Sequence, residues 1–470
     1  MGLRFGGRWF NVLSMTDGEG YRAIREAAVG VTKKLNDAGY VAYFAGGCVR
    51  DALLGKMAKD FDIATSATPE QVQGIFPNAD SIGAHFGVML VKVNVKGQDK
   101  RESFEVATFR TDGSYHDGRR PESVEYSSPE EDAQRRDFTV NGLFQDPMAN
   151  GVTVRVIDFV NGQVDLAAGI LRAIGRPEER FQEDALRLMR AVRFATTLGF
   201  EIESVTWLAI CENADLLEKI SIERIQAEFS KIIVSPNRRR GLELLVDSGL
   251  IKHFLPEVLE LIGCEQPPQW HPEGDVYVHT CIMLEMLGDK EVPLSLALSV
   301  LLHDIGKPAT YTYDKEDDRI RFNGHDGVGA EMSELILRRM KYPNDTIEDV
   351  RVMVANHMNF MHVKQMRVSK LKRFMSRDTF DHEIELHRVD CASSNGFTEN
   401  YDFVLQKREE FANEPLIPEP LIKGRDLMDL GLSPGPRFKE ILTAVQNEQL
   451  EGRLKDGESA IAWVKETYGL

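Results

Sequence analysis

The sequence predicts an α+β protein, with a mixed sheet and its helices in the first third of the chain and helices alone after it. Strand-like runs of β-branched and aromatic residues occur between about residues 40 and 160 and nearly vanish beyond about 165. Beyond that point, apolar residues recur at helical spacing. A length of 470 residues corresponds to two to four domains.

The first third begins with a helix predicted over residues 21–37 and a strand over residues 40–45. That strand enters a Gly46-Gly47 turn, which is followed by another helix. Further strands are expected at residues 88–95, 104–108 and 152–159. Helical spacing then predicts helices at residues 184–198, 222–233, 241–254, 280–287, 294–303 and 328–341.

The change of pattern gives five expected segments. They are a flexible N-terminal extension (residues 1–18), a head (19–165), a helical neck and body (166–265), a metal-binding domain (266–400) and a helical tail (401–470). The first fifteen residues are basic but lack the apolar stretch of a signal peptide, so Met15 is an alternative start. The sequence contains no run of about 18 apolar residues, the length that would predict a membrane span.

Composition excludes several classes of protein. Five cysteines without a CxxC pair indicate neither a disulfide framework nor a zinc ribbon, which favours the cytosol. A net charge of −17 argues against a uniformly basic surface, so if the protein binds nucleic acid, the basic groups must be concentrated in patches. Two basic runs, residues 223–240 and 364–377, are either solvated faces or supply candidate RNA-backbone contacts: Arg238, Arg239, Arg240, Lys364, Arg367, Lys370, Lys372 and Arg373.

A first candidate site surrounds Asp60-Phe61-Asp62. Because side chains alternate along a strand, both carboxylates should face one side while Phe61 enters the core. Adjacent carboxylates repel each other unless a cation lies between them, and hard oxygen ligands suit Mg²⁺. Glu105 is a candidate third carboxylate. The pattern alone also fits a solvated loop, and the Gly46-Gly47 turn fits an ordinary tight turn.

Several motifs in order resemble the bacterial class II tRNA nucleotidyltransferases (CCA-adding enzymes) and their poly(A) polymerase relatives. They are residues 46–51 (GGCVRD), 60–65 (DFDIAT), 107–110 (ATFR), 135–142 (RRDFTVNG) and 183–187 (EDALR). The resemblance implies a polymerase-β-like nucleotidyltransferase head and a helical neck that selects the nucleotide. It implies Mg²⁺ at Asp60 and Asp62, with Glu105 as a third catalytic carboxylate. The nucleotide-binding residues that it implies are Gly46, Gly47, Arg50, Arg110, Arg136, Asp137, Asn141, Asp184, Arg187, Arg190 and Arg193.

Two of these regions have alternatives. Asp184 and Arg187 are expected on one face of one helix, where a carboxylate acceptor and a guanidinium donor can bind the edges of cytosine or adenine. The same pair fits a surface ion pair. Residues 114–130 resemble the flexible loop that the family uses for adding the terminal A, with Arg119 and Arg120 as contacts, or they form a plain hairpin loop.

A second candidate site consists of histidines and aspartates in the series H…HD…H…H…D. Its expected ligands are His279, His303, Asp304, His325, His357 and Asp390, with Asp378 and Asp381 as alternatives for the last. Imidazole with carboxylate suits Mn²⁺, Fe²⁺ or Ni²⁺, which lowers the pKa of bound water. The pattern over residues 270–395 resembles the HD phosphohydrolases, which implies phosphatase or 2′,3′-cyclic phosphodiesterase activity. The sequence leaves open whether this site is active.

These observations give one leading hypothesis: an Mg²⁺-dependent, cytoplasmic enzyme that adds CCA to the 3′ end of tRNA from CTP and ATP and releases pyrophosphate by two-metal nucleotidyl transfer. Enzymes that add only CC or only A are alternatives, as is a poly(A) polymerase, which Ala185-Leu186 disfavours. A different class is a metal phosphohydrolase whose head only binds RNA. An alarmone enzyme is disfavoured by its reversed domain order.

Overall fold

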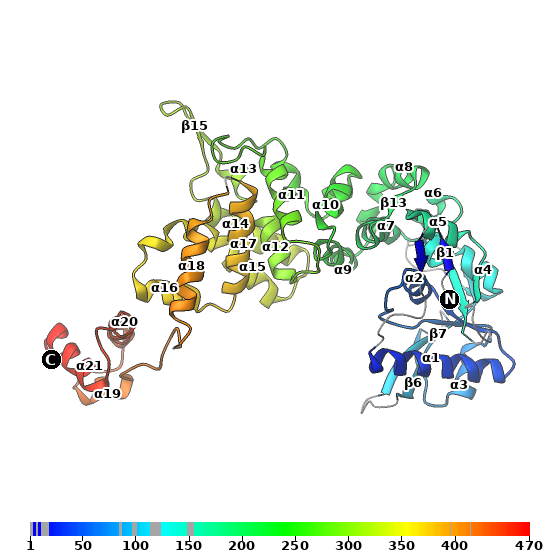
Figure 1. The fold of residues 1–470 in the computed structure, drawn as a ribbon, viewed down its shortest axis with the longest axis horizontal. Helices are drawn as coiled ribbons and strands as arrows, with labels where there is room; N and C mark the ends of the chain where they lie inside the picture. Colours follow the sequence, from blue (N-terminus) through cyan, green and yellow to red (C-terminus); the bar gives the residue numbers. More distant parts are fainter. Residues whose placement is uncertain are drawn as a thin grey trace. The chain divides into compact units, whose positions relative to one another are not determined.

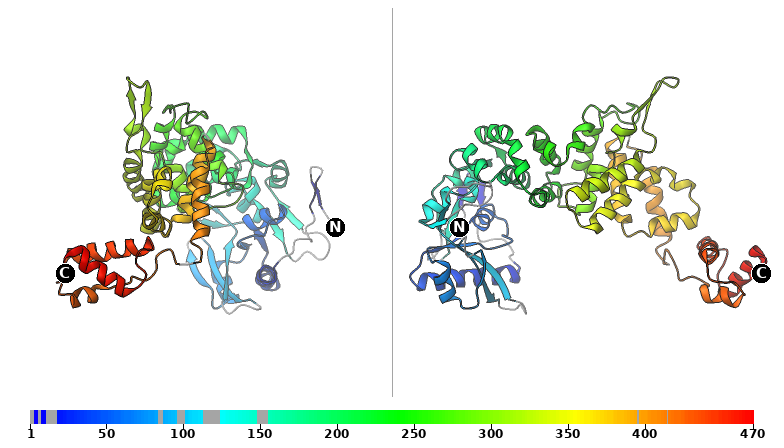
Figure 2. Two further views of the ribbon diagram at one scale, coloured as in Figure 1. Left: turned by 60° about the vertical axis from the view of Figure 1, so that its left-hand side comes forward. Right: turned by 180° about the vertical axis from the view of Figure 1, so that it is seen from behind.

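The computed structural model describes residues 3–5, 8–10, 18–83, 87–95, 101–112, 124–147, 155–394, 396–413 and 415–470. Backbone contacts divide the chain into two compact units. The first contains Met1–Ile232 and Arg240–Phe254, and the second contains Ile233–Arg239 and Leu255–Leu470. Figures 1 and 2 show the course of the chain from blue to red.

The first unit contains a seven-stranded sheet with the order β11-β10-β3-β4-β7-β6-β5. β4 and β7 are parallel, whereas the other neighbours are antiparallel, so the predicted mixed sheet is confirmed. The strands are β3 (Ala42–Ala45), β4 (Ile63–Thr65), β5 (Asp80–Gly83), β6 (Val88–Asn94), β7 (Arg101–Thr108), β10 (Leu143–Asp146) and β11 (Arg155–Asp158).

Shorter strands and the helices complete this unit. Three strand pairs lie outside the large sheet: β1 (Leu3–Phe5) with β2 (Arg8–Phe10), β8 (Arg110–Asp112) with β9 (Val124–Tyr126), and β12 (Ile170–Leu171) with β13 (Glu201–Ile202). The helices are α1 (Glu19–Asp37), α2 (Gly47–Leu53), α3 (Pro69–Ile75), α4 (Pro129–Gln134), α5 (Gly162–Ala168), α6 (Pro177–Glu183), α7 (Leu186–Leu198) and α8 (Ser204–Glu212). α9 (Ile222–Ile233) and α10 (Arg238–Asp247) cross the boundary between the units, and the 3-10 turns are η2 (Thr139–Asn141), η3 (Ala214–Lys219) and η4 (Leu250–His253).

Aromatic packing holds α1 and the segment between α2 and β4 against the sheet. Phe61 is buried, and its ring centre lies 5.4 Å from that of Phe44 on β3 and 5.8 Å from that of Tyr21 on α1. The residues on either side of it, Asp60 and Asp62, are exposed. The expected alternation of Phe61 into the core and both carboxylates outward is therefore observed.

One helix predicted from periodicity is interrupted. The prediction of a helix over residues 241–254 is wrong in part, because α10 ends at Asp247 and a separate 3-10 turn, η4, follows. Gly249 lies between them with φ = 76°, in the left-handed region that glycine adopts without strain and that ends a helix. Apolar spacing continues through this break, which is why periodicity alone missed it.

Among its described residues, the second unit is helical apart from one hairpin of β14 (Thr312–Asp314) and β15 (Arg319–Arg321). Its helices, in the described ranges, are η5 (Pro256–Leu261), α11 (Val276–Met286), α12 (Leu294–Leu302), α13 (Lys307–Thr310), α14 (His325–Arg339), α15 (Asn344–Asn356), η6 (His357–Gln365), α16 (Val368–Met375), α17 (Phe380–Ser393), α18 (Glu399–Glu410), α19 (Gly424–Asp429), α20 (Pro436–Leu450) and α21 (Gly457–Tyr468). No helix in the part of the chain that the structure describes is long and apolar enough to cross a membrane.

Two of the apolar clusters in this unit lie at its C-terminal end. The first joins η6, α16, α17 and α18, and Val404 of α18 packs in it with Phe360 and Phe374. The second joins α19, α20 and α21 around Leu427, Ile441 and related residues. The last three helices therefore have a core of their own.

Candidate functional sites

Three carboxylates meet beside the central strands of the sheet. The register of β4 and β7 pairs Ile63 with Val106, which brings Asp62 level with Glu105 on the adjacent strand. The pKa of Asp62 is raised to about 6 by loss of surrounding water and by the charges of Glu105 and Asp60, while Arg136 opposes the rise. Three like charges with hard oxygen donors fit a divalent cation such as Mg²⁺. The structure thus brings together Asp60, Asp62 and Glu105, and their metal-binding role stays a prediction.

The glycine turn lies against one of the predicted phosphate-binding arginines. Gly46 has φ = 69°, and a Cβ placed on it would lie 3.0 Å from Nη1 of Arg136. A side chain here would therefore strain the backbone and displace the guanidinium. This close approach links two motifs that are about ninety residues apart in the chain.

A buried acid that the sequence analysis missed holds the paired arginines. Asp132 accepts hydrogen bonds from Arg135 (Nη2–Oδ1 2.6 Å) and Arg136 (Nη2–Oδ2 3.0 Å), and its other partner is the backbone N–H of Arg110 at 3.4 Å. Burial acts to raise the pKa of Asp132, but the two guanidiniums lower it overall. The guanidinium of Arg136 also lies 5.0 Å from the ring centre of Phe144. Asp132 lies one helical turn before the arginine pair in the sequence, and this spacing was the signal that could have identified it.

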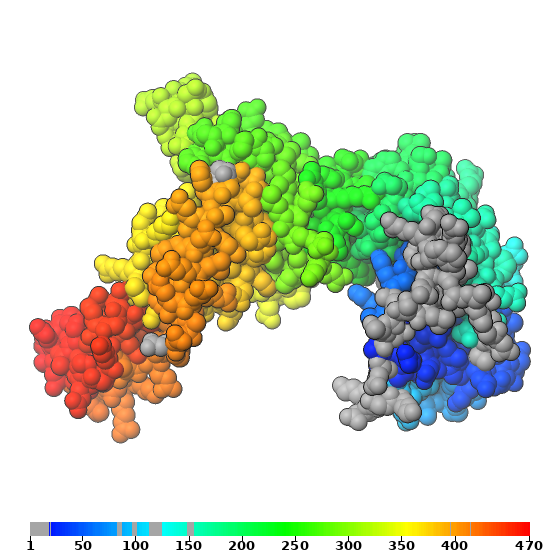
Figure 3. Space-filling model, viewed as in Figure 1, coloured from blue at the N-terminus to red at the C-terminus, as the bar shows by residue number. Residues whose placement is uncertain are grey.

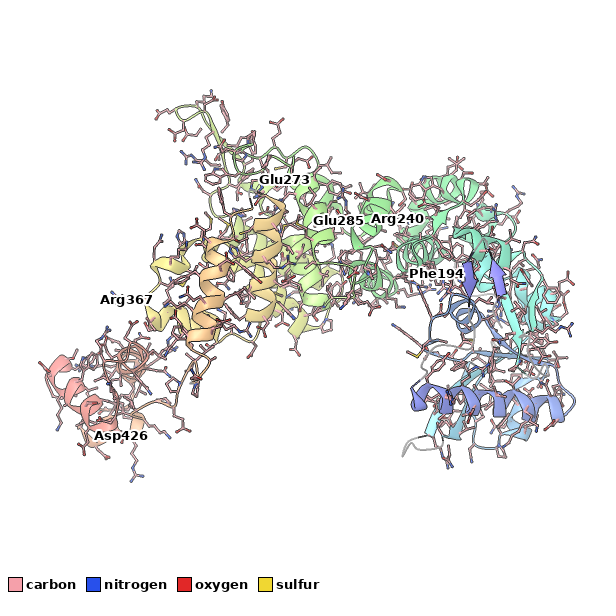
Figure 4. The ribbon with its side chains drawn as sticks, viewed as in Figure 1. Phe194, Arg240, Glu273, Glu285, Arg367 and Asp426 are labelled. Atoms are coloured by element: carbon pink, nitrogen blue, oxygen red, sulfur yellow. The ribbon has the colours of Figure 1, made fainter. Side chains whose placement is uncertain are left out.

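A second network connects the head to α7. Asp137 is buried and accepts hydrogen bonds from Arg190 (Nε 2.8 Å) and Asn141 (Nδ2 3.0 Å), while Arg50 donates to Oδ1 of Asn141 at 2.6 Å. The guanidiniums of Arg50 and Arg190 lie 5.1 and 5.2 Å from the ring centre of Phe194. Phe194, labelled in Figure 4, was not singled out from the sequence.

Arg193 completes the arrangement around that ring. Its guanidinium lies 3.8 Å from the ring centre of Phe194, and it pairs with the buried Glu228 of α9. Three guanidiniums thus surround one aromatic ring, where cation–π attraction fixes their positions. Arg50, Arg190 and Arg193 were all predicted to bind nucleotide, and the structure brings them to one place.

The expectation that Asp184 and Arg187 lie on one face of one helix is wrong. Asp184 has φ = −141° and separates α6 from α7, and its Oδ1 accepts the backbone N–H of Leu186 at 3.1 Å. This side-chain hydrogen bond takes the place of a helical backbone hydrogen bond, and short acidic side chains often compete with the backbone in this way. Asp184 pairs with Arg224 at 3.1 Å, whereas Arg187 pairs with Glu183 at 2.7 Å and donates to the backbone of the arginine pair.

The ion pair of Asp137 and Arg190 makes stability depend on pH. Burial would raise the pKa of Asp137, but Arg190, Asn141 and Arg187 hold it at about 2, against an ordinary value of 3.8. A lowered folded-state pKa stabilises the fold by about 2 kcal/mol above pH 4, and this is lost as the pH falls from about 4 towards 2. We expect Asp137→Asn to lower the melting temperature at pH 7 and to flatten its decline below pH 4. An unchanged decline, with Asp80→Asn as the exposed control, would contradict this assignment.

The second site is a cluster of imidazoles around Asp304, which is buried. Three histidines place Nδ1 against backbone carbonyls, which only accept, so Nδ1 carries the proton and Nε2 its lone pair. The pairs are His303 with Val300 (2.9 Å), His325 with Phe322 (2.8 Å) and His357 with Val354 (2.6 Å). Their Nε2 atoms lie 3.0, 3.4 and 3.9 Å from Asp304 oxygens. Four predicted ligands therefore converge.

The remaining predicted ligands, His279 and Asp390, lie beside each other. Nε2 of His279 is 3.2 Å from Oδ1 of Asp390, and its Nδ1 is 2.7 Å from Oε1 of Glu273. Burial lowers the pKa of His279, but the two carboxylates raise it to about 9. Asp381, an alternative to Asp390, is instead 70% exposed and pairs with Arg408. Glu273, labelled in Figure 4, was not anticipated from the sequence.

These donors fit a divalent transition metal. Among the described residues, the buried Nε2 atom of His303 completes no hydrogen bond, so its lone pair is available to an ion. Burial and the neighbouring His303 lower the pKa of His357 to about 4, which keeps it neutral as a ligand must be. The cluster opens into a cavity of about 490 Å³. Which metal binds stays a prediction.

Glu273 gives a specific test of this fit. Because its carboxylate accepts the Nδ1 proton of His279, it holds Nε2 towards Asp390 and makes the imidazole a better ligand. We expect Glu273→Gln to weaken Mn²⁺ or Ni²⁺ binding by about 10- to 100-fold, measured by calorimetry on the full chain. The control Glu334→Gln, on an exposed ion pair of α14, should leave the affinity unchanged. Equal affinities for wild type and Glu273→Gln would contradict this role.

One predicted RNA contact is wrong. Arg238 is fully buried and donates to the backbone carbonyls of Leu284 (3.2 Å), Gly288 (2.8 Å), Val234 (3.4 Å) and Lys290. Because its guanidinium is buried and donates to backbone carbonyls, Arg238 cannot contact a phosphate. Its two neighbours are partly exposed, and each has an acidic partner: Arg239 with Glu285 at 2.6 Å and Arg240 with Glu201 at 2.9 Å. Arg240 and Glu285 are labelled in Figure 4.

The second basic run also contains both residues with partners inside the fold and exposed residues. Arg373 on α16 donates to Gln446 (2.8 Å) and to a neighbouring side chain of α20, so it joins helices within the second unit. Lys372 lies 4.9 Å from the ring centre of Phe411, and Lys364 pairs with an exposed glutamate of α18. Arg367 and Lys370 are exposed and remain candidate RNA contacts. Arg119 and Arg120 lie outside the described residues.

Comparison with known proteins connects both sites to a family. The poly(A) polymerase head domain matches residues 42–172, the probable RNA- and SrmB-binding site of polymerase A matches residues 199–262, and the HD domain matches residues 276–386. The second match includes α8, α9 and α10, and the third includes the clustered His279, His303, Asp304, His325 and His357 but ends before Asp390. The two candidate sites thus coincide with two separate domain families.

Related proteins agree with this division. A CCA-adding enzyme of Lactococcus lactis subsp. lactis is 48% identical over 229 residues, which cover 48% of the chain and about half, 55%, of that protein. A CCA-adding enzyme of Geobacillus thermodenitrificans is 32% identical over 451 residues, or 94% of the chain and 96% of that protein.

Solved structures agree as well. The CCA-adding enzyme of Bacillus stearothermophilus in complex with CTP matches with a TM-score of 0.72 and 28% identity, and the match covers 96% of this chain and 98% of that one. The Thermotoga maritima enzyme complexed with tRNA shares the fold, with a TM-score of 0.59, 18% identity and 97% of both chains covered. Because it is 32% identical to a CCA-adding enzyme over 94% of its length, the chain belongs to the family of CCA-adding enzymes.

Proposed function

We propose that the chain adds CCA to the 3′ end of tRNA from CTP and ATP, with release of pyrophosphate. The observation that carries the proposal is the meeting of Asp60, Asp62 and Glu105 beside Arg136, since nucleotidyl transfer needs carboxylates for cations and a guanidinium for phosphate. Relatives named CCA-adding enzymes, one of them solved with CTP, support it.

Each group of residues then has a chemical task. The 3′ hydroxyl oxygen of the RNA forms a bond to the α-phosphorus of the incoming nucleotide, and the bond to pyrophosphate breaks. Two Mg²⁺ ions, when bound by Asp60, Asp62 and Glu105, would activate the hydroxyl and neutralise the leaving group. Arg136, oriented by Asp132, donates hydrogen bonds to the phosphates.

Nucleotide selection is assigned to the start of α7. Asp184 and Arg187 lie on either side of the break between α6 and α7, and each is held by another charged residue. An acceptor and a donor in this arrangement can bind the Watson–Crick edges of cytosine and adenine.

The product pattern tests this function. Purified chain is incubated with tRNA lacking its CCA end and with CTP, ATP or both, and products are resolved at single-nucleotide length. CTP alone should add two residues, and both nucleotides should add three. Long A tails on unrelated RNA would instead show a poly(A) polymerase, and two or one added residues with both nucleotides would show a CC- or A-adding enzyme.

A second function, metal-dependent phosphohydrolysis, is favoured by the histidine cluster. The available Nε2 atom of His303 beside Asp304 suits an ion that activates water. The proposed reaction opens a 2′,3′-cyclic phosphate, in which a water oxygen bonds to phosphorus and one ester P–O bond breaks. Formation of a 2′- or 3′-monophosphate from a nucleoside 2′,3′-cyclic phosphate, with Mn²⁺ or Ni²⁺ supplied, tests it, and phosphate release from the monophosphates tests a further phosphatase step.

A further inference from the structure

The cavity at the histidine cluster is much larger than its metal-binding residues require. Its volume is about 490 Å³, within the range of pockets that enclose whole small molecules. Beyond the ligands, its walls include Trp270, Phe322, Met361 and Phe397. We propose that this part of the cavity is a base-stacking subsite, which binds the nucleoside of a terminal nucleotide whose phosphate lies at the histidine cluster. The inference rests on the proposed phosphohydrolase function.

Two exposed aromatic side chains carry the proposal. Trp270, in the loop before α11, is 43% exposed, and Phe397, in the loop before α18, is 63% exposed, although both line the same cavity. Large apolar side chains at a cavity wall lose contact with water only when a ligand covers them. A nucleobase offers a flat face to such a ring and binds it without regard to base identity.

Cationic side chains lie between the cluster and the hairpin. Nζ of Lys307 is 2.6 Å from both Asp304 and Gln266, and it lies 5.4 Å from the ring centre of Phe322. Arg319 on β15 is exposed and lines the cavity, and it has no ion pair among the described residues. A substrate with phosphate near Lys307 and a further phosphate towards Arg319 would match these charges.

The walls argue against a purely inorganic substrate. Pyrophosphate, which the transferase reaction releases, needs cations and hydrogen-bond donors and gains nothing from Trp270, Met361 or Phe397. A nucleotide uses both kinds of wall. The same chemistry is offered by a free mononucleotide and by the last nucleotide of an RNA. The hairpin of β14 and β15 projects from the helices of this unit in Figures 1 and 3, and it carries Arg319 at the cavity.

Kinetics on the full, Mn²⁺-loaded chain tests the subsite. Trp270→Ala and Phe397→Ala should each raise KM for adenosine 2′,3′-cyclic phosphate by about tenfold, while KM for glycerol 2-phosphate, which has no ring, stays within about twofold. Trp270→Phe should restore most of the affinity, because it keeps a stacking ring. The control Leu335→Ala, on an exposed side chain of α14 outside the cavity wall, should change neither value. Equal changes for both substrates would overturn the proposal.

A binding measurement separates this inference from the proposed activity. The fluorescence difference between wild type and Trp270→Phe reports on this cavity alone, and adenosine 3′-monophosphate should quench it even if nothing is hydrolysed. A short RNA with a 3′-phosphate that quenches at lower concentration than the mononucleotide identifies the RNA end as the source. The reverse order identifies the free nucleotide, and no quenching by either overturns the subsite.

Discussion

Replacing Asp60 and Asp62 by asparagine together should lower CMP and AMP incorporation into tRNA by about a thousandfold or more, because divalent-ion stabilisation of the reacting phosphate contributes several kcal/mol. Loss of surrounding water and the charges of Glu105 and Asp60 raise the pKa of Asp62 to about 6, so the three carboxylates repel one another without a cation. Removing two of these charges should therefore leave the melting temperature unchanged or higher in EDTA. Loss of activity through unfolding would give the opposite shift.

Asp80→Asn is the matched control for that variant. Asp80 lies on the same sheet, is 57% exposed and pairs only with Lys92 in the contacts observed. The control should keep incorporation within about twofold, since exposed ion pairs contribute little. If the double variant kept its incorporation rate, the carboxylate site would be wrong, and the head would have the RNA-binding role that the alternative hypothesis gives it.

The predicted carboxylates of the head were identifiable because their pattern is local. Asp60-Phe61-Asp62 alternates with strand periodicity, and Phe61 is buried between two exposed acids as that period requires. The mixed sheet and the change to helices were identifiable for the same reason. Residues of this kind are specified by their immediate neighbours in the chain.

Partners that act across the fold were not identifiable in this way. Asp132 and Glu273 look like ordinary surface acids in the sequence, and only tertiary packing shows that one orients two guanidiniums and the other an imidazole. The prediction for Arg238 was wrong for the opposite reason, because a basic run predicts solvent exposure and the fold buries the first of the three consecutive arginines, Arg238 to Arg240. Asp184 lies at the end of α6, although apolar spacing had predicted that it begins the next helix.

Asp304→Asn should abolish metal binding at the histidine cluster and lower phosphohydrolase activity by about a thousandfold, while tRNA end addition stays within about twofold. Asp304 faces His303, His325 and Lys307, and these positive or ligating groups hold its pKa well below the ordinary range despite burial. The amide keeps the size of the side chain but cannot bind an ion as a charged oxygen does.

Asp304→Asn leaves the charge of buried Lys307 without its carboxylate partner, which destabilises the fold. A second variant therefore separates loss of the metal from loss of folding. Asp390→Asn removes a ligand that is partly exposed and contacts His279 alone among the imidazoles, so it should lose metal and hydrolysis with a smaller change in melting temperature. Asp381, one of the two other acids considered from the sequence, lies in an exposed ion pair, so Asp381→Asn should behave as wild type. If Asp381→Asn lost the metal and Asp390→Asn kept it, the ligand set would be wrong. If Asp304→Asn and Asp390→Asn both lost end addition while remaining folded, the assignment of the two chemistries to different residues would be wrong.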